Sequence, residues 1–556
     1  MARRDARAAG GRFQAWPWHA GTALAALGVL APVLALVGQA GAGSGGHWSH
    51  LLRFVLPDAL AQTLGLLAGV GLLAAALGVG AAWLVTAYEF PGRRILSWAL
   101  LLPLAVPTYV VAYAYLDILH PIGPVQEALR ALLGHASPRD FRLPDLRSLP
   151  GAIVLLAFVL YPYVYLTTRS MFASQAAHLM EAARLLGHGP WSAFRHVALP
   201  LARPAIAVGL CLVLLETLND IGASEFLGVQ TLTVALYTTW VTRSDLAGAA
   251  QIALVALALV TVLIAVERHG RRRLRYTGAR RAAPIRPRRL RGAAGWLAAL
   301  LGLAPVVAGF AAPAAYLLAL ALERLGGGQG PSPALLRAAE QTLTVSALAT
   351  AATVAIGLVV AWSRRILPRA AAWRRALPRL ATLGYALPGT VLAIGLLFPL
   401  MAVERGLAAL RAGAGLDPAG LVLLGTPTAL ALAYVIRFLA IPVGTLEAGL
   451  DRIPPSLDQA ARLLGENVHG TLRRVHLPLL RPALAASALL VFVDAMKELP
   501  ATLLLRPLNF DTLATWLYAE AARGTYEEGA IAALGIVAAG LLPVILLARL
   551  MDRPAA

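Results

Sequence analysis

The segment Glu181–Pro204 reads EAARLLGHGPWSAFRHVALPLARP, and Gln459–Pro482, at a sequence offset of 278, reads QAARLLGENVHGTLRRVHLPLLRP. Thirteen of the 24 aligned positions are identical, without a gap. The chain therefore consists of two related halves, residues 1–270 and 292–556, joined by a basic linker at residues 271–291. Shorter echoes keep the same order: Gln62-Thr63-Leu64 with Gln341-Thr342-Leu343, Pro107 with Pro388, and Thr231-Leu232 with Thr512-Leu513.

The composition excludes an ordinary soluble domain. Hydrophobic residues make up 59% of the chain, charged residues only 14%, and the mean hydropathy is +0.70. Apolar stretches of about 18–25 residues are long enough to cross a bilayer as helices, and lipid leaves no other partner for their backbone groups. We expect an all-α polytopic membrane protein of two parallel six-helix halves. The twelve predicted spans lie near residues 20–40, 59–86, 98–118, 150–168, 204–222, 246–266, 295–320, 340–362, 379–400, 420–442, 482–503 and 528–549.

Positive charge predicts the orientation of the chain in the membrane. Most of the 48 Lys and Arg residues fall on one side when both termini are placed in the cytoplasm, in agreement with the positive-inside rule. Eleven arginines lie between Glu267 and Arg291, so the linker should face anionic headgroups from the cytoplasm. The formal net charge of +20 is therefore better explained by the membrane than by nucleic acid. The single cysteine, Cys211, lies in a predicted span, so an internal disulfide is excluded.

The repeated segment is polar and lies between the fourth and fifth predicted spans of each half, on the cytoplasmic side. Residues 182–186 favour a helix, Gly187 ends it, and Pro200 and Pro204 mark the return to the membrane. A short helix should therefore lie across the cytoplasmic face twice. One interpretation is an amphipathic helix that only anchors the loops at the interface.

Both segments resemble the EAA loop of binding-protein-dependent ABC importer permeases, which have the type I permease fold. In that family the loop forms a coupling helix that docks into a cleft of a cytoplasmic ABC ATPase subunit. Two ATPase subunits are implied, one for each loop. Gln459 replaces the usual Glu, so the resemblance implies a weaker second docking site. The matching residues are Glu181, Ala182, Ala183, Gly187, Val197, Leu199 and Pro200 in the first half, and Gln459, Ala460, Ala461, Gly465, Val475, Leu477 and Pro478 in the second.

The chain itself lacks the motifs of an enzyme. A phosphate-binding P-loop needs a Gly-rich turn ending in Gly-Lys-Ser/Thr, and the only lysine, Lys497, stands in Met496-Lys497-Glu498. The scattered Ser, His and Asp residues form no nucleophile motif. We therefore expect a transport subunit without a cofactor, driven by ATP hydrolysis on a separate subunit.

Acidic residues in the fifth span of each half are candidates for the substrate pathway. Glu216 and Asp220 match Asp494 and Glu498 at the same offset of 278, and each pair is spaced by four residues on one helix face. Ionisable groups at membrane depth are costly and mark a pathway or an interior ion pair. Lys497 could neutralise Asp494 or Glu498, which leaves the structural alternative open; Asn219 occupies the position of Lys497 in the first half.

Residues 220–240 and 496–521 resemble the corresponding regions of fused ferric-iron permeases, and the resemblance covers essentially the whole chain. It implies a bacterial inner-membrane protein, both termini cytoplasmic, that receives Fe³⁺ from a periplasmic substrate-binding protein. Carboxylates suit a hard cation. Thiamine and phosphonate permeases share the layout and remain alternatives. A 6+6 secondary transporter is disfavoured because residues 88–94, YEFPGRR, lack its charged loop signature. No stable metal site is expected at the loop histidines His188, His196, His469 and His476, which lack ligand spacing.

Overall fold

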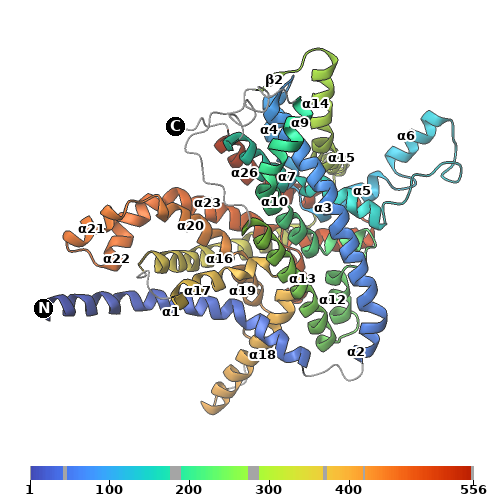
Figure 1. The fold of residues 1–556 in the computed structure, drawn as a ribbon. Helices are drawn as coiled ribbons and strands as arrows, with labels where there is room; N and C mark the ends of the chain where they lie inside the picture. Colours follow the sequence, from blue (N-terminus) through green and yellow to red (C-terminus); the bar gives the residue numbers. More distant parts are fainter. Residues whose placement is uncertain are drawn as a thin grey trace. The chain divides into compact units, whose positions relative to one another are not determined.

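The structure, a computed structural model, describes residues 2–41, 47–175, 189–272, 287–366, 372–416 and 420–551 (Figure 1). Within these ranges the chain is helical except for loops and one short parallel pair of strands, β1 (Tyr88–Glu89) and β2 (Arg288–Arg289). In the described part of the chain, ten helices are long and apolar enough to cross a membrane, or up to twelve spans if each of two bent helix pairs counts as one. The expectation of an all-helical polytopic protein with about twelve spans is confirmed.

Two of the predicted spans, near residues 98–118 and 420–442, correspond to bent helix pairs rather than to straight helices. One joins Arg93–Ala105 to Thr108–Ile118 at 92°, and the other joins Pro427–Phe438 to Ala440–Asp451 at 44°. Pro103 and Pro107 at the first bend lack backbone N–H donors, so a straight helix cannot continue through them. The continuous spans are Trp16–Gly41, Trp48–Ala87, Leu149–Ala173, Trp191–Asn219, Leu246–His269, Ala293–Gly326, Pro333–Ile366, Gly389–Gly413, Val468–Met496 and Tyr526–Leu546.

The chain forms two compact units that do not coincide with its two sequence halves. Unit 1 comprises Met1–Trp48, Thr239–Leu254 and Leu336–Thr515, and unit 2 comprises Ser49–Thr238, Val255–Leu335 and Trp516–Ala556. Each unit therefore takes most of one half together with terminal elements of the other. The division of the chain into halves at residues 1–270 and 292–556 remains a proposal, because the compact units divide the chain at other residues.

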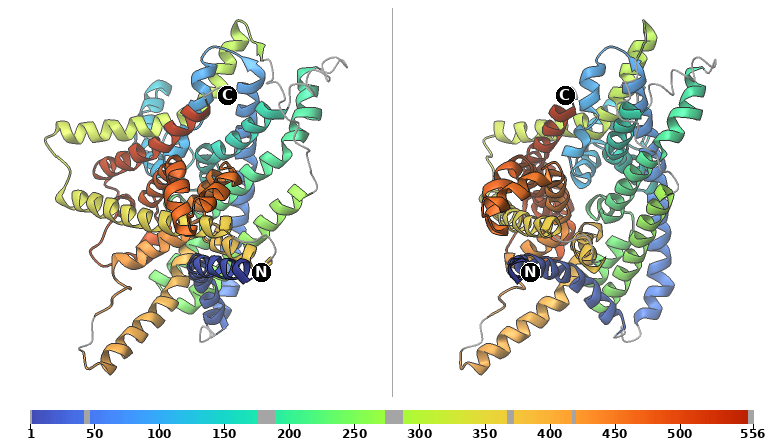
Figure 2. Two further views of the ribbon diagram at one scale, coloured as in Figure 1. Left: turned by 90° about the vertical axis from the view of Figure 1, so that its left-hand side faces the viewer. Right: turned by 60° about the vertical axis from the view of Figure 1, so that its left-hand side comes forward.

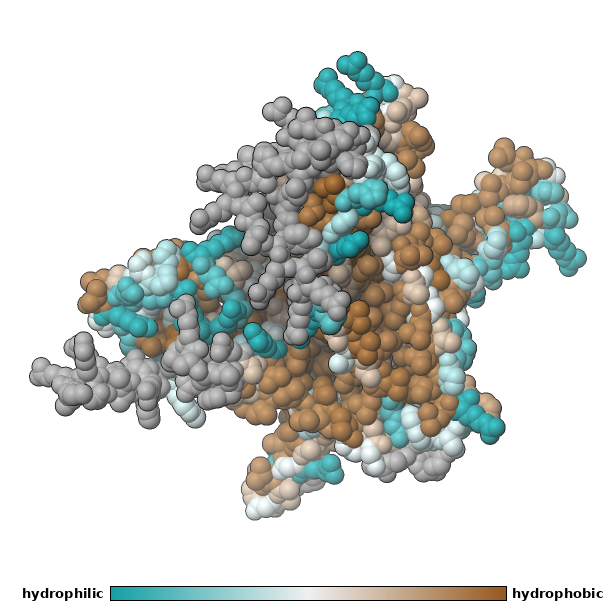
Figure 3. All heavy atoms as spheres, viewed as in Figure 1, coloured by the Kyte–Doolittle hydropathy of each residue, from teal (hydrophilic) through white to brown (hydrophobic). Residues whose placement is uncertain are grey.

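Unit 2 is built around three adjacent helices, α3 (Leu56–Ala87), α7 (Leu149–Gln175) and α10 (Leu199–Asn219). α15 (Ala312–Gly326) and α26 (Tyr526–Met551) run side by side (Figure 2), and both pack on α5 (Thr108–Ile118). Mostly hydrophobic spheres cover the region of α3 and α10 (Figure 3), and Leu72 of α3 is 79% exposed. Apolar side chains in such numbers on an outer face suit lipid rather than water.

Unit 1 contains the N-terminal helix α1 (Ala2–Gly41), which packs on α17 (Ala372–Ala381) and α18 (Gly389–Gly413). The helices α16 (Pro333–Ile366), α20 (Ala440–Asp451) and α23 (Leu477–Met496) enclose an apolar core around Trp362 and Leu446. Between membrane helices, a core of this kind is stabilised by close van der Waals packing of its side chains.

The two repeats use the same close helix contact. A Cβ on Gly78 of α3 would lie 2.7 Å from Val164 Cβ, and one on Gly357 of α16 would lie 2.7 Å from Pro442 Cγ. Val164 and Pro442 are related by the same offset of 278 as the loops, and Gly78 and Gly357 by an offset of 279, so the contact is made by equivalent helices of the two repeats. Small residues at such crossings allow membrane helices to approach closely.

Four five-residue π-helical turns interrupt the long helices, and in each case a proline follows two residues after the turn. The proline has no N–H to donate to the preceding turn, so the hydrogen-bond pattern is locally widened. Two of the turns, η3 and η6, enter the fifth span of each half just before its Leu-Pro pair. The turns are η1 (Leu51–Val55), η3 (Phe194–Ala198), η4 (Val307–Ala311) and η6 (Leu472–His476), and the prolines are Pro57, Pro200, Pro313 and Pro478.

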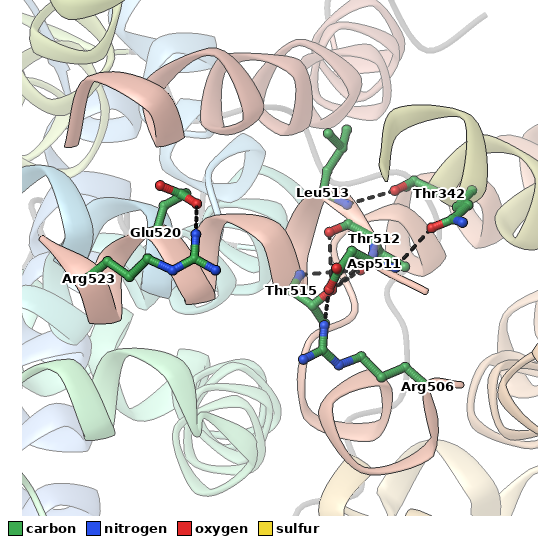
Figure 4. A network of polar contacts seen from close by, with 9 residues as sticks. Thr342, Arg506, Asp511, Thr512, Leu513, Thr515, Glu520 and Arg523 are labelled. Atoms are coloured by element: carbon green, nitrogen blue, oxygen red, sulfur yellow. Dashed lines mark hydrogen bonds and ion pairs between the residues drawn. The ribbon is translucent and has the colours of Figure 1, made fainter. Parts of the chain in front are cut away.

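Two of the short sequence echoes, Gln-Thr-Leu and Thr-Leu, form the same hydrogen-bonded contact in both repeats. In unit 2, the Gln62 and Thr63 side chains accept the backbone N–H groups of Gln230 (2.8 Å) and Leu232 (2.9 Å). In unit 1, Gln341 and Thr342 accept those of Asp511 (2.9 Å) and Leu513 (2.7 Å), as Figure 4 shows for Thr342 and Leu513. Each Gln-Thr pair thus fixes the start of a short helix, α12 (Leu232–Val241) in the first case and α25 (Leu513–Arg523) in the second.

The remaining described elements are the spanning helix α13 (Leu246–Arg272), pieces of other spans and short connections. They are α2 (His47–His50), α4 (Arg93–Ala99), η2 (Leu102–Ala105), α6 (Pro124–Leu133), α9 (Pro190–Ala193), α11 (Gly222–Phe226), α12 (Leu232–Val241), α13 (Leu246–Arg272), α14 (Ala293–Val306), η5 (Leu383–Ala386), α19 (Pro427–Phe438), α21 (Pro455–Leu463), α22 (Val468–Thr471), α24 (Pro500–Leu505) and α25 (Leu513–Arg523).

Candidate functional site: the loop helices and the intramembrane acids

The first-half loop lies mostly outside the described residues. Glu181, Ala182, Ala183 and Gly187 belong to residues 176–188, of which the structure gives no account. Leu199 and Pro200 begin α10 directly after the π-helical turn η3, so the helix is continuous through them. Most of the central linker, residues 273–286, also lies outside the described part of the chain.

The second-half loop is described throughout and contains the predicted short helix, α21. Gln459 and Ala460 are exposed, whereas Ala461 is buried against the protein. Two leucines at the end of the helix point into solvent: Leu463 is 88% exposed and Leu464 is 85% exposed. Sequence reasoning did not single out these leucines, although the repeated Leu-Leu-Gly places the same pair in both loops.

Gly465 ends α21 in the way the sequence predicts for a helix stop. Its φ is +87°, a left-handed conformation that L side chains rarely adopt. The Gly465 N–H donates to Arg462 O at 3.1 Å, and the Glu466 N–H donates to Ala461 O at 2.9 Å. These two bonds form a Schellman motif. Asn467 then caps α22 by accepting the Gly470 N–H at 2.7 Å, so the turn between the two helices is fully specified.

A charged cluster fixes α21 to the body of unit 1. Asp458 Oδ2 accepts two bonds from the Arg365 guanidinium, at 3.1 Å and 2.9 Å, and Asp458 Oδ1 lies 2.5 Å from His476 Nε2. Arg365 also donates to the backbone oxygens of Leu450 (2.8 Å) and Ile453 (2.9 Å). Arg365 ends α16 and His476 ends η6, so one carboxylate joins α21 to two membrane helices. We call Asp458, Arg365 and His476 the loop clamp.

The first half has no counterpart of the loop clamp in its sequence. Ala198 aligns with His476 and Met180 aligns with Asp458, both at the offset of 278. Arg365 aligns with Thr86 at an offset of 279, the same offset that separates Thr342 from Thr63. Thr86 donates its hydroxyl to the backbone oxygen of Ala82, within its own helix. The residues of the loop clamp are thus not repeated in the first half of the sequence.

The other loop histidines are placed separately. His196 contacts Ser192 one turn earlier, and the His469 ring packs against the Trp18 ring at a tilt of 43°, with centroids 5.3 Å apart. His188 lies outside the described residues. Among the described residues no group of three or more His, Cys, Asp or Glu side chains could hold a metal ion.

Asp220 caps the short helix α11. Its Oδ1 accepts the Ala223 N–H at 2.8 Å, and its Oδ2 accepts the Thr108 hydroxyl. Asp220 is buried, while Glu216, one turn earlier on α10, is partly exposed. A buried carboxylate with several donors is a satisfied structural group as well as a candidate for the pathway.

Glu498 caps the equivalent helix α24 and also forms an ion pair. Its Oε1 accepts the Ala501 N–H at 2.9 Å, and its Oε2 lies 3.3 Å from Arg437 Nε. Arg437 comes from α19, a helix distant from Glu498 in sequence, and was not recognised as a partner from the sequence. Lys497 pairs instead with Asp494, Nζ to Oδ1 at 2.8 Å, and both of these side chains are partly exposed.

Each half therefore has a buried carboxylate at this position, and the two carboxylates have different partners. Thr108 in the first half corresponds to Gly389 in the second, since each follows the matching proline. A Cβ on Gly389 would lie 2.7 Å from Glu498 Oε1 and 2.8 Å from Arg437 Nη1. Gly389 therefore leaves room for the Arg437 guanidinium. In the first half, Val159 aligns with Arg437 at the offset of 278. The Thr108 hydroxyl donates to the Asp220 carboxylate, whereas the Arg437 guanidinium pairs with the Glu498 carboxylate.

The fold and these sites define a membrane transport component with two related, loop-bearing halves. The family described as the binding-protein-dependent transport system inner membrane component matches residues 69–276 and again residues 353–554. The chain belongs to this family. It is a multi-pass inner-membrane protein and the permease component of a binding-protein-dependent ABC importer.

Two relatives extend over nearly the full length. The Fe(3+)-transport system permease protein FbpB 2 of Haemophilus influenzae is 24% identical over 503 residues, which are 90% of this chain and 91% of the relative. The probable ABC transporter permease protein y4fN of Sinorhizobium fredii is 26% identical and covers 88% of this chain and 87% of its own. A shorter relative, the molybdenum transport system permease protein ModB of Escherichia coli, is 30% identical over 34% of this chain and 82% of its own.

Proposed function

We propose that this permease imports ferric iron delivered by a periplasmic binding protein. The observation that carries the proposal is the similarity over 90% of the chain to a permease named for Fe³⁺ transport, with both halves included. The acidic residues in and after the fifth spans agree in sign with a cationic substrate. Molybdate is the second candidate, because the molybdenum permease has the higher identity, though over only 34% of this chain.

We further propose that two separate cytoplasmic ATPase subunits drive transport, one at each loop. The exposed Leu463 and Leu464 beside Gln459 give α21 an apolar tip, suited to insertion into a cleft of another protein. The loop clamp gives the tip a rigid base, so a push on α21 is passed to α16 and η6. Both termini and the linker at 271–291 then lie in the cytoplasm. Gln459 still removes one charge from the second docking site.

The iron assignment is tested by growth and uptake in a bacterium that lacks its own ferric importers. Cells expressing this chain with its neighbouring ATPase and binding-protein genes should accumulate radioactive iron, and an excess of molybdate or sulfate should not compete. Accumulation of molybdate without accumulation of iron would favour the second candidate.

A further inference from the structure

A small oxygen-rich cluster lies just beyond the fifth spans, apart from the acids already described. Tyr518 of α25 donates its hydroxyl to Glu225 Oε2 at 2.5 Å, and Tyr237 of α12 is hydrogen-bonded to Tyr518. The Tyr518 ring stacks on Phe226 with centroids 5.4 Å apart, which fixes its orientation. Glu225, Tyr237 and Tyr518 are all partly exposed.

The two tyrosines occupy equivalent positions in the two repeats. Tyr237 follows Thr231 by six residues, and Tyr518 follows Thr512 by six residues. The Gln-Thr contacts described above hold the two starting points in the same way. Equivalent residues of two repeats related by an axis can touch only close to that axis. The Tyr237–Tyr518 contact therefore places the cluster near the axis between the repeats, where a solute passing between them would travel.

The carboxylate of the cluster comes from one repeat only. Glu225 lies at the offset of 278 from Leu503, so the second repeat supplies no acid there. Glu225 does not cap a helix, in contrast to Asp220 and Glu498, whose oxygens are engaged by the starts of α11 and α24. One carboxylate and two phenols are thus available to a ligand at one place.

The charges of such a set suit a trivalent cation. Hard cations prefer oxygen ligands, and phenolate is an established protein ligand of Fe³⁺. On binding, each tyrosine releases its proton to water, the two phenolates and the carboxylate form bonds to the ion, and no electron is transferred. The three negative charges then balance the three positive ones, so the complex is neutral in surroundings where net charge is costly. A divalent ion would leave a negative charge, and an oxyanion would be repelled by Glu225.

We propose that Glu225, Tyr237 and Tyr518 form a transient binding site for Fe³⁺ on the transport route. The proposal rests on the proposed function, because it names the place at which that substrate is held. Water molecules complete the coordination sphere, and three protein ligands allow the ion to leave again.

The test uses the purified full-length chain in detergent, titrated with Fe³⁺ supplied as its nitrilotriacetate chelate. The wild-type protein should show a saturable phenolate-to-iron absorption band in the visible range. Tyr237→Phe and Tyr518→Phe should each weaken binding, because loss of a group that only supports a metal ligand already costs about 10–100-fold in affinity. The double variant should show no band. No band in the wild type, or an unchanged band in the double variant, would overturn the proposal.

A matched control separates a binding role from a merely structural one. Tyr316 also donates to a carboxylate in the same unit, Asp117 Oδ2 at 2.8 Å. Tyr316→Phe should leave the band and the iron affinity unchanged, and a parallel loss in this control would contradict a specific site. Phenylalanine keeps the ring of Tyr518 against Phe226, and equal melting temperatures of the variants would show that folding is unaffected.

Iron uptake by the complete importer distinguishes failure of this site from failure of the proposed function. A wild-type importer that takes up no ferric iron refutes the function itself. An importer that takes up iron equally well with and without both tyrosine hydroxyls refutes only the site. The expected result is wild-type uptake with a reduction of about tenfold or more in the double variant.

Discussion

Replacing Asp458 by Asn tests whether the loop clamp holds α21 in place. The change keeps the size of the side chain but removes the charge that faces Arg365 and His476. Hydrogen bonds to charged groups contribute about 1.5–3 kcal/mol each to stability. Arg365 still donates to two backbone oxygens in the variant, so only part of this free energy is lost. The Asp458 and Arg365 side chains are 20% and 15% exposed, so solvent screens part of the remainder.

We therefore expect Asp458→Asn to weaken the attachment of α21 by about 2 kcal/mol, which is about 30-fold in the equilibrium between attached and released helix. Hydrogen exchange of the amides in α21 reports this opening directly. Exchange there should accelerate by about that factor while the helices α16 and α23 keep their protection. The matched control is Asp451→Asn, an exposed carboxylate at the end of α20 that takes no part in the clamp. Equal exchange of α21 in wild type and Asp458→Asn would refute the clamp.

Three further predictions concern the loops, the buried carboxylates and the topology. Gly465→Val should strain the left-handed turn by about 1–3 kcal/mol and reduce transport without loss of membrane insertion, measured as uptake per amount of membrane protein; Gly187→Val should reduce transport more if the first loop carries the stronger docking site. Arg437→Val should destabilise unit 1 by about 3–5 kcal/mol in thermal unfolding, because it leaves the Glu498 carboxylate buried without an ion-pair partner. The triple variant Gly389→Thr, Arg437→Val, Glu498→Asp copies the residues of the first half and should recover much of this loss. No recovery would contradict the equivalence of the Asp220 and Glu498 sites. Single cysteines placed in the linker 271–291 of a Cys211→Ser protein should resist an impermeant thiol reagent in intact cells, and labelling from outside would invert the orientation.

Much of the architecture could be predicted because the repeat is visible in local sequence. The gapless match of the two loops, the apolar lengths of the spans and the left-handed glycine at 465 each depend on residues close together in the chain. The Leu-Pro pairs also predict a change in the helix at the entry to the fifth spans, though not that it takes the form of a π-helical turn.

The remaining features depend on contacts between distant residues. Lys497 is a visible partner for the acids beside it, but Arg437 pairs with Glu498 from another helix, and no local pattern indicates it. Arg365 lies far before Asp458 in the chain, so the loop clamp could not be predicted for the same reason. The Tyr237–Tyr518 contact could have been suspected from the repeat, because equivalent residues meet at an axis, yet the sequence does not say which equivalent pair does so.

ATP-driven accumulation of iron in proteoliposomes is the most direct test of the central claim. The vesicles would contain this chain with its ATPase subunits, ATP on the side of the loops, and the ferric-loaded binding protein on the other side. We predict accumulation of iron that requires ATP and the binding protein. It should be lost when the repeated Leu-Leu pairs of both loop sequences are changed, Leu185 and Leu186 to Asp together with Leu463 and Leu464 to Asp. Accumulation of molybdate but not of iron under the same conditions would contradict the account.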